Sequence, residues 1–190
     1  MRIGITMGDA CGVGPELILR AYKDQLIVKD FLVIGDYEVL DHCRSILGYE
    51  LPLRRIANAD DVVDGFLNIL DLGLLRRDQI TIGRISKEAG EAAIRYVEHA
   101  TLLALEGKVD AIVTLPINKE ASRLSDREFT GHTELIAKLC NETNYTMMLV
   151  SDKLAVTHVS THVSMREAID RVKKDRIYNV IQLTHEALSR

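Results

Sequence analysis

The segment Thr130–Glu134 places a hydroxyl, a glycine, an imidazole, a second hydroxyl and a carboxylate in succession, directly before an apolar helical run. Its glycine lets the backbone take a conformation that a side chain would forbid, so that His132 and Thr133 lie at the start of the helix. A helix start offers unpaired N–H groups and the positive end of the helix dipole, and both attract anions. The alternative is an ordinary helix start, capped by Thr130 or Thr133 and with Glu134 in its first turn.

A second segment, Gly8–Glu16, is rich in glycine and lies between a predicted strand and a predicted helix. Pro15 suits the first helical position, and Glu16 complements the helix dipole. The segment partly resembles a dinucleotide-binding loop, but Leu17 stands where that motif needs its third glycine, and the Lys-Ser/Thr pair of a P-loop is absent. These residues favour a tight strand-to-helix turn over a cofactor loop.

A third segment, His158–His162, contains two histidines four residues apart. On a helix they could share a metal ion, but the surrounding valines and threonines favour a strand. On a strand the two residues would be about 13 Å apart, at about 3.3 Å per residue, which is too far for one ion. We therefore expect at most one of them to bind a metal, with the other ligands supplied from elsewhere. The alternative for each is an ordinary core or surface histidine.

The elements that must position these segments alternate between strands and helices. Short apolar or β-branched runs predict strands at residues 3–7, 31–34, 53–56, 68–72, 110–114, 147–150 and 154–161. Helical patterns are found at residues 15–23, in a segment ending at Gly48, and at residues 60–66, 86–106 and 178–188. This alternation predicts an α/β sandwich with a largely parallel sheet. The last helix has no following strand, so we expect the chain to be incomplete at its C-terminus, unless that helix docks on the sheet as a terminal element.

Composition argues against several classes of protein. The 190 residues carry 24 basic and 28 acidic side chains without a basic run, which disfavours a nucleic-acid partner. The distant cysteines Cys11, Cys43 and Cys140 disfavour a zinc ribbon and suit a reducing compartment. We find neither a signal peptide nor an apolar run of about 18 residues, and therefore expect a cytoplasmic protein with no membrane partner.

Four motifs, taken together and in order, resemble one family. They are Gly-Asp-x-x-Gly-x-Gly-Pro-Glu at residues 8–16, Asp-Ala-Ile-Val-Thr-Leu-Pro-Ile-Asn-Lys at 110–119, Phe-Thr-Gly-His-Thr-Glu at 129–134, and Met-Met-Leu at 147–149 with Ser-Thr-His at 160–162. Their order and spacing resemble the 4-hydroxythreonine-4-phosphate dehydrogenase family of pyridoxal phosphate biosynthesis. The resemblance implies the three-layer α/β/α architecture of isocitrate and isopropylmalate dehydrogenases, which bind NAD without a Rossmann fingerprint. We accordingly expect residues 1–118 to belong to a first domain and residues 119–190 to begin a second.

The same resemblance implies roles for four residues. His132 and Thr133 match the substrate-binding pair, Lys119 matches a catalytic lysine, and His162 matches the first of three histidines that bind a divalent metal (zinc, magnesium or cobalt). NAD, or NADP, is the implied cofactor, and no residue of the chain is assigned to it. The family's other two metal histidines lie beyond this chain, and His185 lacks their surrounding motif. A small phosphorylated substrate and a homodimer are the implied partners.

The chain also departs from the family pattern. Ala10 and Cys11 stand where Pro and Ala are common, and Ser164 and Met165 stand where Pro and Leu are frequent. These departures leave the subfamily open.

The resemblance implies NAD-dependent oxidation of a phosphorylated 3-hydroxy acid to a β-keto acid, which then loses carbon dioxide. The metal would acidify the hydroxyl and stabilise the enolate. The first expected substrate is 4-phosphooxy-L-threonine, giving 3-amino-2-oxopropyl phosphate, and the alternatives are 4-phospho-D-threonate and 4-phospho-D-erythronate. A function of another class is a non-catalytic binding or assembly remnant. With one metal ligand and half a substrate site, the 190-residue chain alone is expected to be inactive and to self-associate.

Overall fold

The computed structural model describes residues 1–27 and 29–189, which form two compact units, Met1–Cys140 and Asn141–Arg190. Each unit is described here by itself. Among the helices of these residues, none combines the length and the apolar character needed to cross a membrane.

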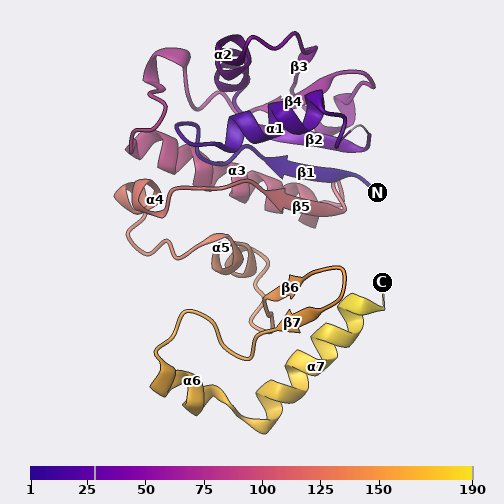
Figure 1. The fold of residues 1–190 in the computed structure, drawn as a ribbon, viewed down its shortest axis with the longest axis vertical. Coiled ribbons are helices and arrows are strands. Elements are labelled where there is room, and N and C mark those ends of the chain that lie inside the picture. Colours follow the sequence, from indigo (N-terminus) through magenta and orange to yellow (C-terminus); the bar gives the residue numbers. More distant parts are fainter. Residues whose placement is uncertain (28, 190) are drawn as a thin grey trace. The chain divides into compact units, whose positions relative to one another are not determined.

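Five parallel strands form the central sheet of the first unit, in the order β3-β4-β2-β1-β5 (Figure 1). They are β1 (Ile3–Thr6), β2 (Phe31–Gly35), β3 (Leu53–Ile56), β4 (Leu67–Asp71) and β5 (Ala111–Thr114). In the register, Ile3 of β1 lies beside Phe31 of β2 on one side and Ala111 of β5 on the other. Every residue of β2 is buried, as is typical of a parallel strand that is covered on both faces.

Helices cover both faces of this sheet. They are α1 (Gly14–Lys23), α2 (Tyr37–Leu47), α3 (Lys87–Leu105), α4 (Lys119–Ser125) and α5 (His132–Leu139), with short 3₁₀ helices η1 (Ala59–Asp61) and η2 (Arg77–Gln79). The connections through α1 and α2 run one way along the sheet, and the connection through α3 runs back the other way. Right-handed crossovers therefore place α3 on the face opposite α1 and α2, which confirms the predicted three-layer α/β/α fold.

The long helix α3 is the support on which the site is built. The helix predicted at residues 86–106 is confirmed, and its residues Ala89, Ala93, Tyr96 and Ala100 form a buried apolar stripe. Ser86 caps the helix by accepting a hydrogen bond from the Ala89 N–H. A Cβ atom at Gly90 would collide with the backbone of α4, so that this glycine lets the two helices approach closely and sets the position of α4.

The second unit consists of an antiparallel hairpin and two helices. They are β6 (Met148–Val150), β7 (Ala155–Thr157), α6 (Met165–Arg171) and α7 (Lys174–Leu188). The Thr184 hydroxyl of α7 donates to the Thr157 hydroxyl of β7 at 3.0 Å. Arg176 of the same helix donates to the backbone oxygens of Val159 and Tyr145 at 3.0 and 2.9 Å. These bonds tie α7 to the hairpin.

Three predicted elements are wrong in extent. The helix expected at residues 178–188 begins about one turn earlier, at Lys174. The helix expected at residues 60–66 is limited to η1, because the Asn68 side chain bonds to both the N–H and the oxygen of Val63 and holds the following residues in a turn. The strand expected at residues 154–161 ends at Thr157, because its partner β6 begins only at Met148. The compact units divide at Cys140 and not at residue 118, since α4 and α5 pack on α3; the domain boundary of a longer protein stays a prediction.

Candidate functional site

The glycine-rich loop between β1 and α1 uses its own polar groups internally. Gly8 has a φ of +74°, and a Cβ atom there would collide with the Pro116 oxygen, which accepts a hydrogen bond from the Asp9 N–H at 3.0 Å. The buried Asp9 carboxylate accepts from the Cys11 N–H at 2.9 Å, and burial raises the pKa of Asp9. The Asp9 backbone oxygen accepts from Gly12. The loop therefore forms the tight strand-to-helix turn that its sequence favours, and the amides of Asp9, Cys11 and Gly12 are already paired.

A buried carboxylate that the sequence interpretation missed lies directly after β2. Asp36 is fully buried and accepts hydrogen bonds from the N–H groups of Leu74 and Leu75, at 2.8 and 2.9 Å, and from the Tyr96 hydroxyl. Burial raises the pKa of Asp36, and these donors partly offset the increase. An acidic residue at the end of an apolar strand was the available signal. Asp36 anchors the loop between β4 and α3 at the carboxyl edge of the sheet.

The start of α5 is free of side-chain caps. Its N-cap residue is Gly131, with extended backbone (φ 159°, ψ −179°), and no side chain bonds to the first-turn amides. The alternative in which Thr130 or Thr133 caps the helix is therefore wrong, whereas the placement of Glu134 in the first turn is confirmed. Uncapped amides at a helix start are available to an anionic ligand.

Lys119 and α5 meet at Gly131, although they are distant in sequence. A Cβ atom built on Gly131 would be 3.7 Å from Lys119 Nζ and 3.1 Å from Glu134 Oε2. A side chain at this position would therefore occupy the space next to both charged groups. Among the described residues, no carboxylate lies within 4.0 Å of the Lys119 ammonium to form an ion pair. The lysine thus brings a positive charge without an ion-pair partner to the start of α5, on the side of Gly131 where the Glu134 carboxylate also lies.

The His132 imidazole is half-buried beside this charge. Burial lowers the pKa of His132, and the positive charge of Lys119 lowers it further, so that the ring is neutral near pH 7. Its Nε2 atom is buried and has no hydrogen-bond partner among the described residues. Thr133, also half-buried, follows as the second residue of α5. The structure therefore brings three of the four predicted residues into one region, where a polar atom is left without a partner.

The fourth predicted residue, His162, belongs to the second unit. It is exposed, and its φ of +55° places it outside any strand. His158 directly follows β7, and its ring Nδ1 lies 3.3 Å from the Met147 oxygen. The two histidines therefore do not share a strand, and the spacing expected from a strand does not apply to them. Within residues 1–27 and 29–189, no three His, Cys, Asp or Glu side chains are grouped closely enough to hold a metal ion.

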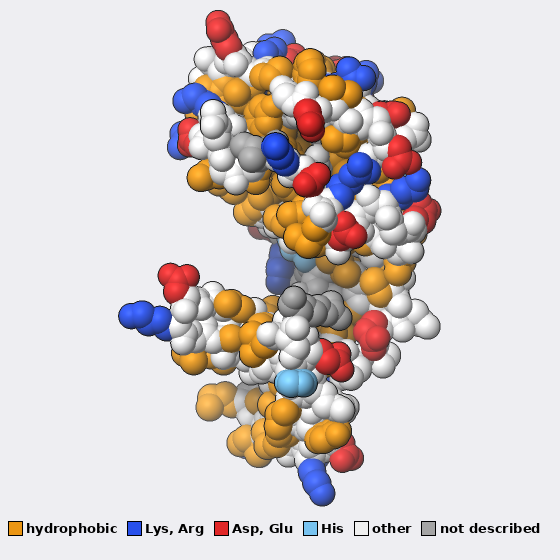
Figure 2. Space-filling model, turned by 90° about the vertical axis from the view of Figure 1, so that its right-hand side faces the viewer, with side chains coloured by type: hydrophobic (Ala, Val, Ile, Leu, Met, Phe, Trp, Pro, Cys, Tyr) orange, Lys and Arg blue, Asp and Glu red, His pale blue; other side chains and the backbone are white. Residues whose placement is uncertain are grey.

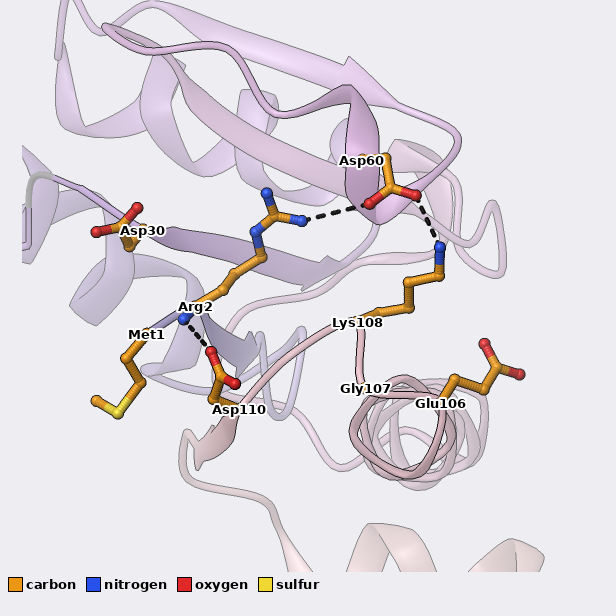
Figure 3. A pocket seen from close by; sticks show the side chains of 8 residues that line it. All are labelled: Met1, Arg2, Asp30, Asp60, Glu106, Gly107, Lys108 and Asp110. Carbon is orange, nitrogen blue, oxygen red and sulfur yellow. Dashed lines mark hydrogen bonds and ion pairs between the residues drawn. The ribbon is translucent and has the colours of Figure 1, made fainter.

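A pocket of about 520 Å³ lies at the other edge of the sheet, where β1 and β5 begin (Figure 3). Arg2 and Lys108 both contact the Asp60 carboxylate there, at 3.6 and 2.8 Å, and the Arg2 N–H donates to Asp110 at 2.6 Å. In open α/β sheets, ligands bind at the carboxyl ends of the strands. The charged groups of this pocket largely satisfy one another, so we place the candidate site at Lys119 and His132.

Comparisons with known proteins agree with the motif resemblance. The family model described as pyridoxal phosphate biosynthetic protein PdxA matches residues 28–190. A D-threonate 4-phosphate dehydrogenase of Cupriavidus necator is 38% identical, and the match covers 99% of this chain and 57% of that protein. A 4-hydroxythreonine-4-phosphate dehydrogenase of Trichlorobacter lovleyi is 35% identical over 96% of the chain and 56% of its own length.

A solved structure shares the fold. The crystal structure of a 4-hydroxythreonine-4-phosphate dehydrogenase from Burkholderia phymatum aligns with a TM-score of 0.86 at 38% identity, covering 98% of this chain and 58% of that one. The chain thus spans less than three-fifths of the length of each of these relatives. The matched region includes β2 through α7, with Lys119, His132 and His162. The chain belongs to the family of pyridoxal phosphate biosynthetic proteins called PdxA.

Proposed function

We propose that this chain is the substrate-binding part of a dehydrogenase that oxidises a small phosphorylated hydroxy acid. The observation that carries the proposal is the Lys119 ammonium, which forms no ion pair, next to Gly131 and the uncapped start of α5. Together they form a place for an anionic group. The names of the relatives, all dehydrogenases, support the oxidation.

Each residue of this region would act by binding and orientation. The Lys119 ammonium attracts a carboxylate or phosphate, and the first-turn amides of α5 donate to the same group. The neutral His132 ring offers its unpaired Nε2 to a substrate hydroxyl or oxygen, and the Thr133 hydroxyl lies at the adjacent helical position. A neutral ring can accept or donate a hydrogen bond there, whereas a second cation would repel Lys119.

The charge of this region favours D-threonate 4-phosphate over the amino acid substrate. An ammonium group on the substrate would meet the like charge of Lys119, which costs about 1–4 kcal/mol at about 4 Å depending on solvent exposure. A hydroxyl in its place carries no such cost. The Cupriavidus necator relative, a D-threonate 4-phosphate dehydrogenase, supports D-threonate 4-phosphate as the first candidate substrate. The motifs alone gave 4-phosphooxy-L-threonine as the first candidate. The second candidate remains 4-phosphooxy-L-threonine, supported by the Trichlorobacter lovleyi relative.

NAD, or NADP, is our proposed hydride acceptor, and a divalent metal with His162 as one ligand is our proposed second cofactor. The described residues do not assemble a site for either. The amides of the Gly8–Glu16 loop that could meet a pyrophosphate are paired within the protein, and His162 is a single exposed imidazole. We therefore derive no step of the reaction through these groups and propose that their remaining ligands lie outside the described residues.

The test uses an extended protein, defined as this chain followed by the C-terminal part of the Cupriavidus necator relative that lies beyond the match. We expect NADH formation with D-threonate 4-phosphate at a kcat/KM about tenfold or more above that with 4-phosphooxy-L-threonine, because about 1.4 kcal/mol is tenfold. Lys119→Met should lower kcat/KM and reduce this preference. Lys138→Met, which changes an exposed lysine in the last turn of α5, should change neither. Activity with neither substrate would support the non-catalytic alternative and overturn the proposal.

Metal content gives a second measurement on the extended protein. His162→Ala should lower the amount of bound metal. His158→Ala should not, because that ring is bonded within the hairpin. The opposite result would show that the wrong histidine is assigned. The chain Met1–Arg190 alone should form no NADH.

A further inference from the structure

The Glu134 carboxylate lies beside the same glycine as the Lys119 ammonium. A Cβ atom built on Gly131 would be 3.1 Å from Glu134 Oε2 and 3.7 Å from Lys119 Nζ. Both charged groups therefore border one small space, which is open because residue 131 has no side chain. Glu134 itself is half-buried in the first turn of α5, two residues after His132.

These two charges differ from the ion pairs found elsewhere on the first unit. Charges of both signs are interspersed over its visible face in the upper part of Figure 2, and some are in direct contact, such as Arg44 with Asp41 at 2.7 Å. Among the described residues, Lys119 and Glu134 form no ion pair within 4.0 Å with each other or with another residue. Both can therefore bond to a third group placed between them.

Hydrogen bonds in the preceding turn hold Gly131 in place. The Phe129 N–H donates to the Asp126 oxygen at 3.1 Å, and the Phe129 side chain is buried. Arg123 Nε of α4 donates to the Phe129 oxygen at 3.0 Å. The turn is thereby fastened to α4, the helix that begins at Lys119. The space between the two charged groups is therefore bordered by backbone that is already fixed.

A group that binds in this space must suit both charges. A lysine ammonium can only donate hydrogen bonds, and an ionised carboxylate can only accept them. A carboxylate or phosphate of the ligand would satisfy Lys119 and meet the like charge of Glu134, whereas a ligand ammonium would do the reverse. A hydroxyl carries no charge, accepts from Lys119 and donates to Glu134. The pair therefore selects a hydroxyl.

The place of this hydroxyl on the substrate follows from the anionic group beside it. Lys119 has three N–H donors, so it can contact both an anionic group at the start of α5 and the hydroxyl. In either candidate substrate, the ester oxygen and a methylene group separate the phosphate from the nearest hydroxyl-bearing carbon. The carboxylate is bonded directly to carbon 2, which bears a hydroxyl in D-threonate 4-phosphate and an ammonium in 4-phosphooxy-L-threonine. The hydroxyl next to the anionic group is therefore the one on carbon 2.

We propose that Glu134 is a specificity-determining residue, which together with Lys119 binds the hydroxyl on carbon 2 of D-threonate 4-phosphate. This inference rests on the proposed function and adds a second charge to its site. With 4-phosphooxy-L-threonine, the Glu134 carboxylate offsets part of the repulsion between Lys119 and the substrate ammonium. Glu134 thus sets how strongly the site distinguishes the two substrates.

The experiment compares the kcat/KM of the extended protein with D-threonate 4-phosphate, its 2-deoxy analogue and 4-phosphooxy-L-threonine. Glu134→Gln keeps an acceptor oxygen for the hydroxyl but removes the charge that attracts an ammonium. We expect this variant to widen the preference for D-threonate 4-phosphate over 4-phosphooxy-L-threonine by about tenfold. Glu128→Gln removes an equal charge from an exposed residue of the neighbouring turn and should leave the preference unchanged.

Glu134→Ala separates a contact with the substrate from a structural role. It should lower kcat/KM with D-threonate 4-phosphate by about 10- to 100-fold, and with the 2-deoxy analogue by about threefold at most, because the analogue offers no hydroxyl to bind. An equal loss with all three compounds would show a structural role and overturn the inference. So would an unchanged preference in Glu134→Gln. In both cases the activity of the protein with Glu134 intact would leave the proposed function standing.

Binding gives a readout that does not depend on turnover. If the extended protein oxidises neither substrate, calorimetry makes the same comparison through the Kd of D-threonate 4-phosphate and of its 2-deoxy analogue. Weaker binding of the hydroxylated compound alone in Glu134→Ala would support the inference although the proposed oxidation had failed. Binding of neither compound would overturn the inference together with the proposed function.

Discussion

At the amino edge of the five-stranded sheet, the charged side chains are exposed and neutralise one another. Asp60 forms ion pairs with both Lys108 and Arg2, and these two positive charges lower the pKa of Asp60 (Figure 3). At the carboxyl edge, Asp9 and Asp36 are buried and bonded to N–H and O–H donors, and their pKa values are raised. The same type of side chain is therefore used in two opposite ways on one sheet.

This comparison shows which edge of the sheet can hold a functional site. Water screens the exposed ion pairs, so they contribute little to the stability of the protein. The charged groups of the amino edge bond to one another, and few polar atoms there lack a partner. The carboxyl edge holds its loops with buried hydrogen bonds. It also has buried polar atoms without partners among the described residues, namely Thr6 Oγ1 on β1 and, beyond β5, His132 Nε2. Unpaired polar atoms next to a firmly held backbone are what a ligand can use.

Replacing the buried carboxylate of the carboxyl edge should have the largest effect. We expect Asp36→Asn to lower the free energy of unfolding by about 3 kcal/mol, because Oδ2 accepts from both Leu75 N–H and the Tyr96 hydroxyl, and an amide nitrogen would face two donors. Tyr96→Phe should cost about 1 kcal/mol, since one hydrogen bond is lost. Denaturant titration measures both. A variant Asp36→Asn as stable as the original chain would show that burial of the charge outweighs these bonds.

The second effect concerns the unpaired imidazole. In the extended protein, His132→Ala should lower kcat/KM by roughly 10- to 100-fold, which corresponds to about 1.5–3 kcal/mol for a hydrogen bond to a charged ligand. The melting temperature should change little, because Nε2 has no partner to lose among the described residues. His99→Ala on α3 is the control and should leave the kinetics unchanged. Unchanged kinetics for His132→Ala would remove this residue from the site.

A smaller effect should appear in the pH dependence of stability. The pKa of His132 is lower in the folded protein than in the unfolded chain, where it is about 6.5. As the pH falls below about 6.5, the unfolded chain takes up a proton that the folded protein does not, so stability is lost. His132→Gln should remove this contribution and flatten the curve between about pH 7 and pH 5. Parallel curves for the two proteins would contradict the lowered pKa.

The amino edge should give the smallest effect. Lys108→Ala removes the 2.8 Å ion pair with Asp60, which is open to solvent. We expect a slight loss of stability at low ionic strength that disappears in about 1 M salt, because the Debye length is then about 3 Å. Thermal unfolding at two salt concentrations measures it. A loss of stability in Lys108→Ala as large as that in Asp36→Asn would contradict the difference proposed between the two edges of the sheet.

Where each helix or strand ends depends on contacts with residues distant in sequence, which a local sequence pattern does not contain. The apolar runs of β1, β2 and β4 were predictable, as was the stripe of α3, since burial on both faces or on one stripe imposes its own periodicity. The helix at residues 60–66 was wrong because the buried amide of Asn68 selects a turn. The strand through residue 161 was wrong because β-propensity does not reveal where the pairing strand stops.

By itself, the sequence determined the alternation of strands and helices, the tight turn at Gly8–Glu16 and the resemblance that the PdxA family match confirms. Those features are local or follow from ordered motifs, so they need no long-range contact. Only the tertiary structure decided that Lys119 meets Gly131 and His132, because that meeting requires the close approach of α4 to α3 at Gly90. It also decided that Asp36 is a buried anchor, since its donors come from residues 74, 75 and 96, far along the chain.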